Sequence, residues 1–84
     1  MNLEQAPERT ATLSVRHYDR VGVLAAVLEE LRRGRLNVAT MSNRIFAGSV
    51  AAAATLDVAG VINDDLLDAV RALPDVIQVS VFKA

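Results

Sequence analysis

The chain of 84 residues contains no cysteine and no tryptophan, with one tyrosine and two phenylalanines as its only aromatic residues. The lack of cysteine excludes disulfide bonds and thiolate metal sites. No apolar run approaches the roughly 20 residues of a membrane helix, and a net charge of −1 gives no strong field to attract nucleic acid or an anionic membrane. We therefore expect a cytoplasmic protein with no metal, no cofactor, no nucleic-acid partner and no membrane partner.

The composition that remains is typical of a small packed domain, because 52% of the residues are hydrophobic. Residues 1–9 are polar and aperiodic, so we expect a flexible N-terminal tail or linker followed by one domain over 10–84. A domain of this size buries only about 60% of its unfolded surface. Without disulfides or metals, such domains commonly gain stability by forming oligomers.

Hydrophobic periodicity predicts six elements in the order βαββαβ. Alternating residues predict strands over 10–17, 36–46, 50–58 and 77–82, and helical spacing predicts helices over 21–33 and 63–73. In the second strand the apolar parity changes between Val38 and Met41, which predicts a bulge or bend there. A hairpin turn is expected at residues 47–49. The order favours the α+β ferredoxin-like sandwich: a four-stranded antiparallel sheet with two helices on one face.

The residues give no support for two functions that this fold can carry. RNA-binding versions stack bases on aromatics of the central strands, and the segments TATLSVRH and VAAAATLDV contain none. A catalytic serine needs an adjacent oriented base, but Ser14 and His17 fall on opposite faces of one strand. Asp64 and Asp65 are typical of charges at a helix start. We therefore expect no enzyme.

One candidate site remains, at the junction between the first strand and the first helix. The amides near Gly22 and Val23 would donate hydrogen bonds to a carboxylate, as helix N-termini do. Asp19 would pair with an ammonium group, His17 would bond a hydroxyl, and Asn37 offers both a donor and an acceptor. From spacing alone, structural roles are favoured instead: Asp19 as the N-cap, His17 as a strand end and Asn37 as a turn residue.

The stretch that contains these residues, "HYDRVGVLAAVLEELRRGRLNV", resembles the signature of ACT domains, small regulatory modules that bind amino acids. The later segments "MSNRIFAGSVAAAATLDV" and "LPDVIQVSVFKA" are similar to the ACT domain that closes many D-3-phosphoglycerate dehydrogenases, where serine is the feedback inhibitor. The resemblance spans residues 11–83.

This resemblance implies a ligand site between two subunits. It places His17, Asp19, Arg20, Val21, Gly22 and Val23 of one subunit near Asn37 of a neighbour. Asp19 departs from the family by replacing an amide with a carboxylate, and Val21 departs by replacing the proline of the turn.

The resemblance implies a non-catalytic regulatory domain that forms a homodimer or larger homo-oligomer. It also implies that the domain binds a small amino acid, with serine as the leading candidate. Such a domain would control an attached or partner metabolic enzyme of the phosphoglycerate dehydrogenase kind. The alternative is an oligomerisation module that binds no ligand.

Overall fold

The computed structural model describes residues 10–46, 48 and 50–83, and the predicted order of elements is confirmed in that part of the chain. The strands are β1 (Thr10–Tyr18), β2 (Asn37–Ile45), β3 (Ala51–Ala59) and β4 (Val76–Lys83), and the helices are α1 (Val23–Arg33) and α2 (Asp64–Arg71). The expected tail over residues 1–9 lies outside the described residues, and so does most of the turn at 47–49.

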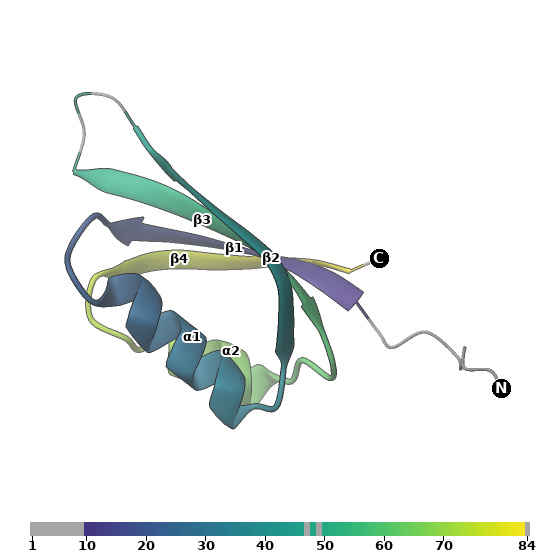
Figure 1. Ribbon diagram of the computed structural model, residues 1–84. Coiled ribbons are helices and arrows are strands. Elements are labelled where there is room, and N and C mark those ends of the chain that lie inside the picture. Colours follow the sequence, from purple (N-terminus) through teal and green to yellow (C-terminus); the bar gives the residue numbers. More distant parts are fainter. Residues whose placement is uncertain (1–9, 47, 49, 84) are drawn as a thin grey trace, which may run out of the picture.

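The four strands form one sheet in the order β2-β3-β1-β4, with every pair antiparallel. Both helices lie on the same side of this sheet (Figure 1). The predicted ferredoxin-like sandwich is therefore confirmed. The arrangement leaves β2 and β4 as the edge strands, and it leaves one broad face of the sheet without helices.

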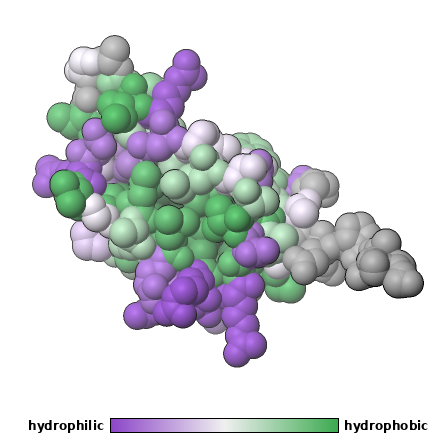
Figure 2. All heavy atoms as spheres, viewed as in Figure 1, coloured by the Kyte–Doolittle hydropathy of each residue, from purple (hydrophilic) through white to green (hydrophobic). Residues whose placement is uncertain are grey.

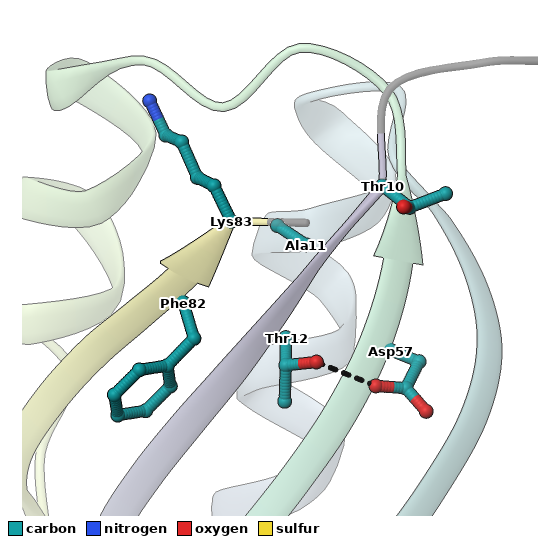
Figure 3. Close-up of a pocket in the computed structure, with 6 residues that line it drawn as sticks. All are labelled: Thr10, Ala11, Thr12, Asp57, Phe82 and Lys83. Atoms are coloured by element: carbon teal, nitrogen blue, oxygen red, sulfur yellow. Dashed lines mark hydrogen bonds between the residues drawn. The ribbon is translucent and has the colours of Figure 1, made fainter.

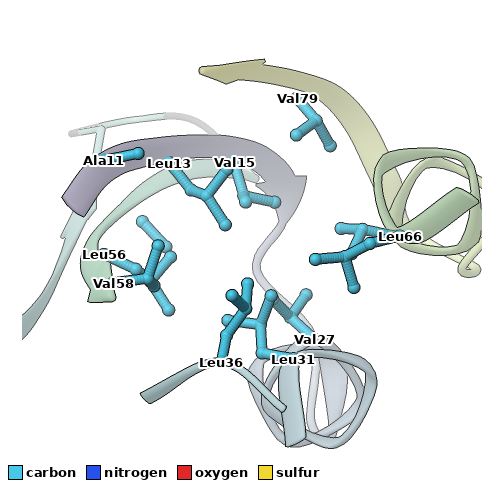
Figure 4. Close-up of a cluster of buried hydrophobic side chains, with 12 residues drawn as sticks. Ala11, Leu13, Val15, Val27, Leu31, Leu36, Leu56, Val58, Leu66 and Val79 are labelled. Carbon is cyan, nitrogen blue, oxygen red and sulfur yellow. The ribbon is translucent and has the colours of Figure 1, made fainter. Parts of the chain in front are cut away.

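The core lies between the helices and the covered face of the sheet (Figure 4). Alternate residues of β1 and β3 point into it, because successive side chains of a strand face opposite sides. Leu13, Val15 and Leu56 are fully buried there, and they pack with Val27 and Leu31 of α1. The spacing of those two α1 residues, four apart, keeps them on one side of the helix.

Helix α1 starts two residues later than the pattern predicts, at Val23, because Gly22 adopts the left-handed conformation with φ 88°. It ends with two backbone hydrogen bonds: the Arg35 amide donates to the Arg32 carbonyl, and the Leu36 amide donates to the Leu31 carbonyl. Gly34 is the C-cap, as predicted. A Cβ at Gly34 would lie 3.1 Å from Leu66 Cδ1, so glycine allows α1 and α2 to approach closely.

Helix α2 begins as predicted, because the Asn63 side chain accepts a hydrogen bond from the Leu66 amide at 2.9 Å. Asp64 and Asp65 occupy the first turn, where the helix dipole favours negative charge. The helix ends at Arg71, earlier than the predicted stop at Pro74.

The predicted irregularity in β2 is confirmed, since the pairing with β3 shifts register between Val38 and Thr40. The extra residue turns every later side chain of β2 to the other side. Thr40 pairs with Asp57 on the helix-free face, whereas Met41 pairs with Leu56 on the helix side. Asn43 and Ile45 follow Met41 on the helix side.

Candidate functional site

The junction between β1 and α1 is an exposed loop. Val21 is fully exposed, and a Cβ built on Gly22 would meet nothing within 4 Å. The left-handed backbone at Gly22 disfavours a side chain even though space is available. The loop therefore presents backbone to the surroundings at the N-terminus of α1, as the sequence predicted.

The amide donors of this loop differ from the prediction by one position. The Val23 amide already donates to the Arg20 carbonyl at 3.3 Å. The first helical bond runs from Ala26 to the Gly22 carbonyl. The amides of Leu24 and Ala25 lie between these two, and they are the groups that a helix leaves unbonded at its N-terminus.

Asp19 is not the N-cap, so the structural role proposed for it from spacing is wrong. The N-cap is Gly22, and no side chain caps the helix. The Asp19 amide instead donates to the Val50 carbonyl at 2.6 Å, which ties the loop to the start of β3. The Asp19 side chain is exposed beside the helix N-terminus.

Arg20 turns away from the helix N-terminus toward Asp75, the residue before the start of the neighbouring strand β4. Its Nε lies 3.6 Å from Asp75 Oδ1, and its guanidinium carbon lies 5.8 Å from the centre of the Tyr18 ring. The ion pair is largely exposed and contributes little to stability. Arg20 therefore contacts Asp75 and Tyr18 rather than the helix N-terminus.

His17 is buried, with 1% of its surface exposed, and both ring nitrogens have partners. Nδ1 lies 2.9 Å from the Tyr18 carbonyl, and Nε2 lies 2.9 Å from Asn43 Oδ1. A carbonyl only accepts, so Nδ1 carries the proton. Nε2 pairs with the side-chain amide of Asn43, which can present either its oxygen or, after a half-turn, its N–H.

Two small residues make this contact possible. His17 is opposite Ala52, and Asn43 is opposite Ala54, so the two long side chains meet above neighbouring alanines of β3. Both alanines are fully buried. The periodicity did not identify Asn43 as a partner of His17. The signal was present in the parity change of β2, which puts Asn43 on the helix side.

Asn37 lies at the other end of the sheet from His17 in the same chain. It pairs with Ala59, which pairs with Thr10 at the start of β1, whereas His17 is at the end of β1. Thr10 and His17 are seven positions apart along the extended strand, a distance of roughly 23 Å. Residues His17 to Val23 therefore lie together, but Asn37 of the same chain is too far away to share a site with them.

A second polar cluster lies on the helix-free face. The hydroxyl of Thr12 donates to Asp57 Oδ1 at 2.8 Å, and that of Thr40 donates to Oδ2 at 2.6 Å. Hydrogen bonds from Thr40 and then Thr12 hold the pKa of the Asp57 carboxyl below its usual value. An open hollow of about 400 Å³ lies beside this cluster, next to Phe82 and Lys83 (Figure 3).

Two classes of feature are absent from the described part of the chain. No helix in residues 10–46, 48 and 50–83 is long and apolar enough to cross a membrane. Over the same residues, no three side chains of the histidine, aspartate or glutamate type gather closely enough to hold a metal ion.

Comparison of the structure with solved structures finds the same fold in other proteins. The C-terminal domain of the MgtC protein from Mycobacterium tuberculosis is similar with a TM-score of 0.75 and 13% identity, covering 98% of this chain and 94% of that one. An ACT domain protein from Streptococcus pneumoniae is similar with a TM-score of 0.73 and 16% identity, covering 92% and 91%.

A third similar structure is the ACT domain from GTP pyrophosphokinase of Chlorobium tepidum, with a TM-score of 0.68 and 19% identity, covering 89% of this chain and 99% of that domain. No protein-family model matches the sequence, and a search among curated proteins gives no match. The likeness therefore establishes the fold: the chain has an ACT-like βαββαβ fold.

Proposed function

We propose that this chain is a non-catalytic regulatory domain of the ACT type that dimerises and binds a small amino acid between two subunits, with serine as the first ligand to test. The observation that carries the proposal is the exposed segment from Asp19 to Gly22, which sets the Asp19 carboxylate beside the N-terminal amides of Leu24 and Ala25 in the first turn of α1. A zwitterionic amino acid needs both a cation acceptor and an anion donor. Its carboxylate would face the amides of Leu24 and Ala25, and its ammonium group would face Asp19.

The edge strand β2 supports a dimer that joins two sheets side by side. It has an unpaired edge, and the apolar side chains of Met41 and Ile45 on it are 43% and 55% exposed. Figure 2 shows an apolar area at the centre of the view, above the charged side chains at the end of α1. An exposed apolar edge is an aggregation hazard unless another strand covers it.

Such a dimer would also complete the ligand site. In an antiparallel pairing of two β2 strands centred on Met41, Asn37 of the partner subunit is opposite Ile45, because each residue is four positions from the centre. Ile45 pairs with Ala52, which pairs with His17. In this dimer, Asn37 of the partner subunit would therefore lie at the end of the sheet that holds the loop.

The regulated enzyme would be an attached or partner metabolic enzyme in the cytoplasm, of the phosphoglycerate dehydrogenase kind that the sequence resembles. The similar ACT domain from Chlorobium tepidum is part of GTP pyrophosphokinase, which supports this type of arrangement.

The burial of His17 favours a second candidate, an oligomerisation module without a ligand. The ring is 1% exposed and both nitrogens are already bonded, so His17 would contact a hydroxyl of the ligand only after Asn43 moves away. A loop that served only to connect β1 and α1 would have the same geometry.

Calorimetry with a panel of amino acids separates the two candidates. If the site is shared, Asn37→Ala removes one hydrogen bond to a charged group, worth about 1.5–3 kcal/mol, and affinity falls roughly ten- to a hundredfold. Asp68→Ala, at an exposed position of α2 outside both proposed interfaces, is the control and leaves affinity unchanged. Absence of binding by any amino acid would leave the oligomerisation module, and a dimer lost in Met41→Glu would then support it.

A further inference from the structure

The helix-free face of the sheet is organised in rows that cross all four strands. The register pairs Ser42 with Thr55, Thr55 with Ser14, and Ser14 with Ser80. All four of these side chains carry a hydroxyl on Cβ, and they form a row that we call the hydroxyl row. These side chains are short and polar, so the row presents no steric obstacle to a second surface.

The two rows that flank the hydroxyl row carry opposite charge. On one side is the acidic row, where Asp57 lies between Thr40 and Thr12, with Phe82 beyond them on β4. Figure 3 shows Phe82, Thr12 and Asp57 side by side on this face.

On the other side is the arginine row, where Ala53 lies between Arg44 and Arg16, with Gln78 on β4. Arg16 and Arg44 are exposed, and Arg16 lies 5.9 Å above the ring of Phe46. Within residues 10–46, 48 and 50–83, neither guanidinium has a carboxylate within ion-pair distance. The alanine between them leaves a gap in the surface that is bordered by two positive charges.

We propose that a second copy of this chain docks face to face on the helix-free face, about a two-fold axis that runs along the hydroxyl row. An axis across the strands keeps each strand over its own counterpart and exchanges the two ends of the face. The acidic row of each copy then lies over the arginine row of the other. Asp57 is opposite Ala53 of the partner subunit, between Arg16 of the partner subunit and Arg44 of the partner subunit.

The geometry of stacked sheets suits these pairs. Sheets pack about 10 Å apart, and arginine spans such a gap while alanine does not obstruct it. Each carboxylate oxygen of Asp57 accepts one hydroxyl hydrogen bond and keeps a second lone pair for a guanidinium. The contact occurs twice by symmetry. The hydroxyl rows face each other across the axis, where serine and threonine bond directly or through water.

This interface is separate from the side-by-side dimer proposed above, because that dimer uses the edge of β2 and this one uses the face of the sheet. A chain that makes both contacts forms a tetramer, and a chain that makes only this contact forms a dimer. Loss of the face-to-face contact is therefore distinguishable from loss of the β2 contact.

Charge reversal tests the proposal by analytical ultracentrifugation of the full chain. Asp57→Arg places positive charge against the arginine row, and the double variant Arg16→Asp with Arg44→Asp places negative charge against Asp57. Each should weaken the face-to-face step at least tenfold, as should high salt, which screens exposed charges. An equimolar mixture of the two should associate again as a heterodimer, because every contact then pairs opposite charges.

Two controls keep the test decisive. Asp68→Arg makes the same change of charge on α2, on the other side of the sheet, and should leave association unchanged. Asp57→Asn removes the charge with less disturbance to Thr12 and Thr40, so it replaces Asp57→Arg if circular dichroism shows that the latter is unfolded. The proposal is overturned if wild-type association is unaffected by these reversals, or if the mixture of the two reversed variants stays dissociated.

Discussion

Replacing Asn43 by alanine tests the contact that fills the space above β3. The substitution removes the partner of His17 Nε2, in a ring that is 1% exposed in the wild-type protein. A buried polar atom that loses its partner costs about 1–3 kcal/mol. Asn43 itself is exposed, so its removal opens a path for water to the ring. We therefore expect the lower end of the range, about 1 kcal/mol, or a fall of roughly 4–8 °C in Tm.

Urea unfolding at one fixed protein concentration measures this cost, since dimerisation would make apparent stability depend on concentration. Asp68→Ala, at an exposed position of α2 outside both proposed interfaces, is the control and should stay within about 0.5 kcal/mol of wild type. His17→Leu in both backgrounds closes a double-mutant cycle. Once the ring is gone, Asn43→Ala should cost little, which gives a coupling energy of at least about 0.5 kcal/mol.

Nitrogen NMR of the ring should show a proton on Nδ1, because the Tyr18 carbonyl that this nitrogen faces only accepts. The prediction is wrong if Asn43→Ala is no more costly than Asp68→Ala, or if its cost is the same with and without the His17 ring. Either result would mean that the amide and the ring do not stabilise one another.

Two further predictions concern Gly60 and Asp57. Gly60→Ala should lower the free energy of unfolding by about 2–4 kcal/mol, because φ is 131° and the new Cβ would lie 2.7 Å from Leu36 Cδ2. Gly22→Ala meets nothing within 4 Å and should lower it by only about 1–2 kcal/mol. Denaturant unfolding measures both, and equal losses would contradict the steric difference. The lowered pKa of Asp57 means that its carboxylate stabilises the fold above the unfolded pKa of about 3.9, and that this contribution is lost as pH falls through the lower folded pKa. The advantage of wild type over Asp57→Asn should thus be constant at neutral pH and shrink below about pH 4, and an advantage that stays the same in acid would show that the threonine bonds do not favour the ionised form.

Much of the fold could be predicted because its signals are local. The cap at Asn63 depends on residues within one helical turn, and the β2 bulge appears as a parity change between Val38 and Met41. The errors were local too. The pattern did not show that Gly22 would take the left-handed conformation, which delays α1 to Val23 and removes Asp19 from the cap.

The candidate site could be predicted only in part. The segment from Asp19 to Gly22 is continuous in sequence, so its position before a helix followed from the pattern. The partner of His17 did not, because Asn43 is 26 positions away and reaches it across a third strand. That contact depends on the exact register of β1, β2 and β3 together.

The sequence by itself determined the order of elements, the composition of each strand and the absence of cysteine chemistry, because these depend on residue type and local spacing. Only the tertiary structure decided that His17 is buried against Asn43, that Asn37 lies at the opposite end of the sheet, and that opposite charges flank the hydroxyl row. The physical reason is that hydrogen-bond register between strands far apart in the chain decides which side chains become neighbours.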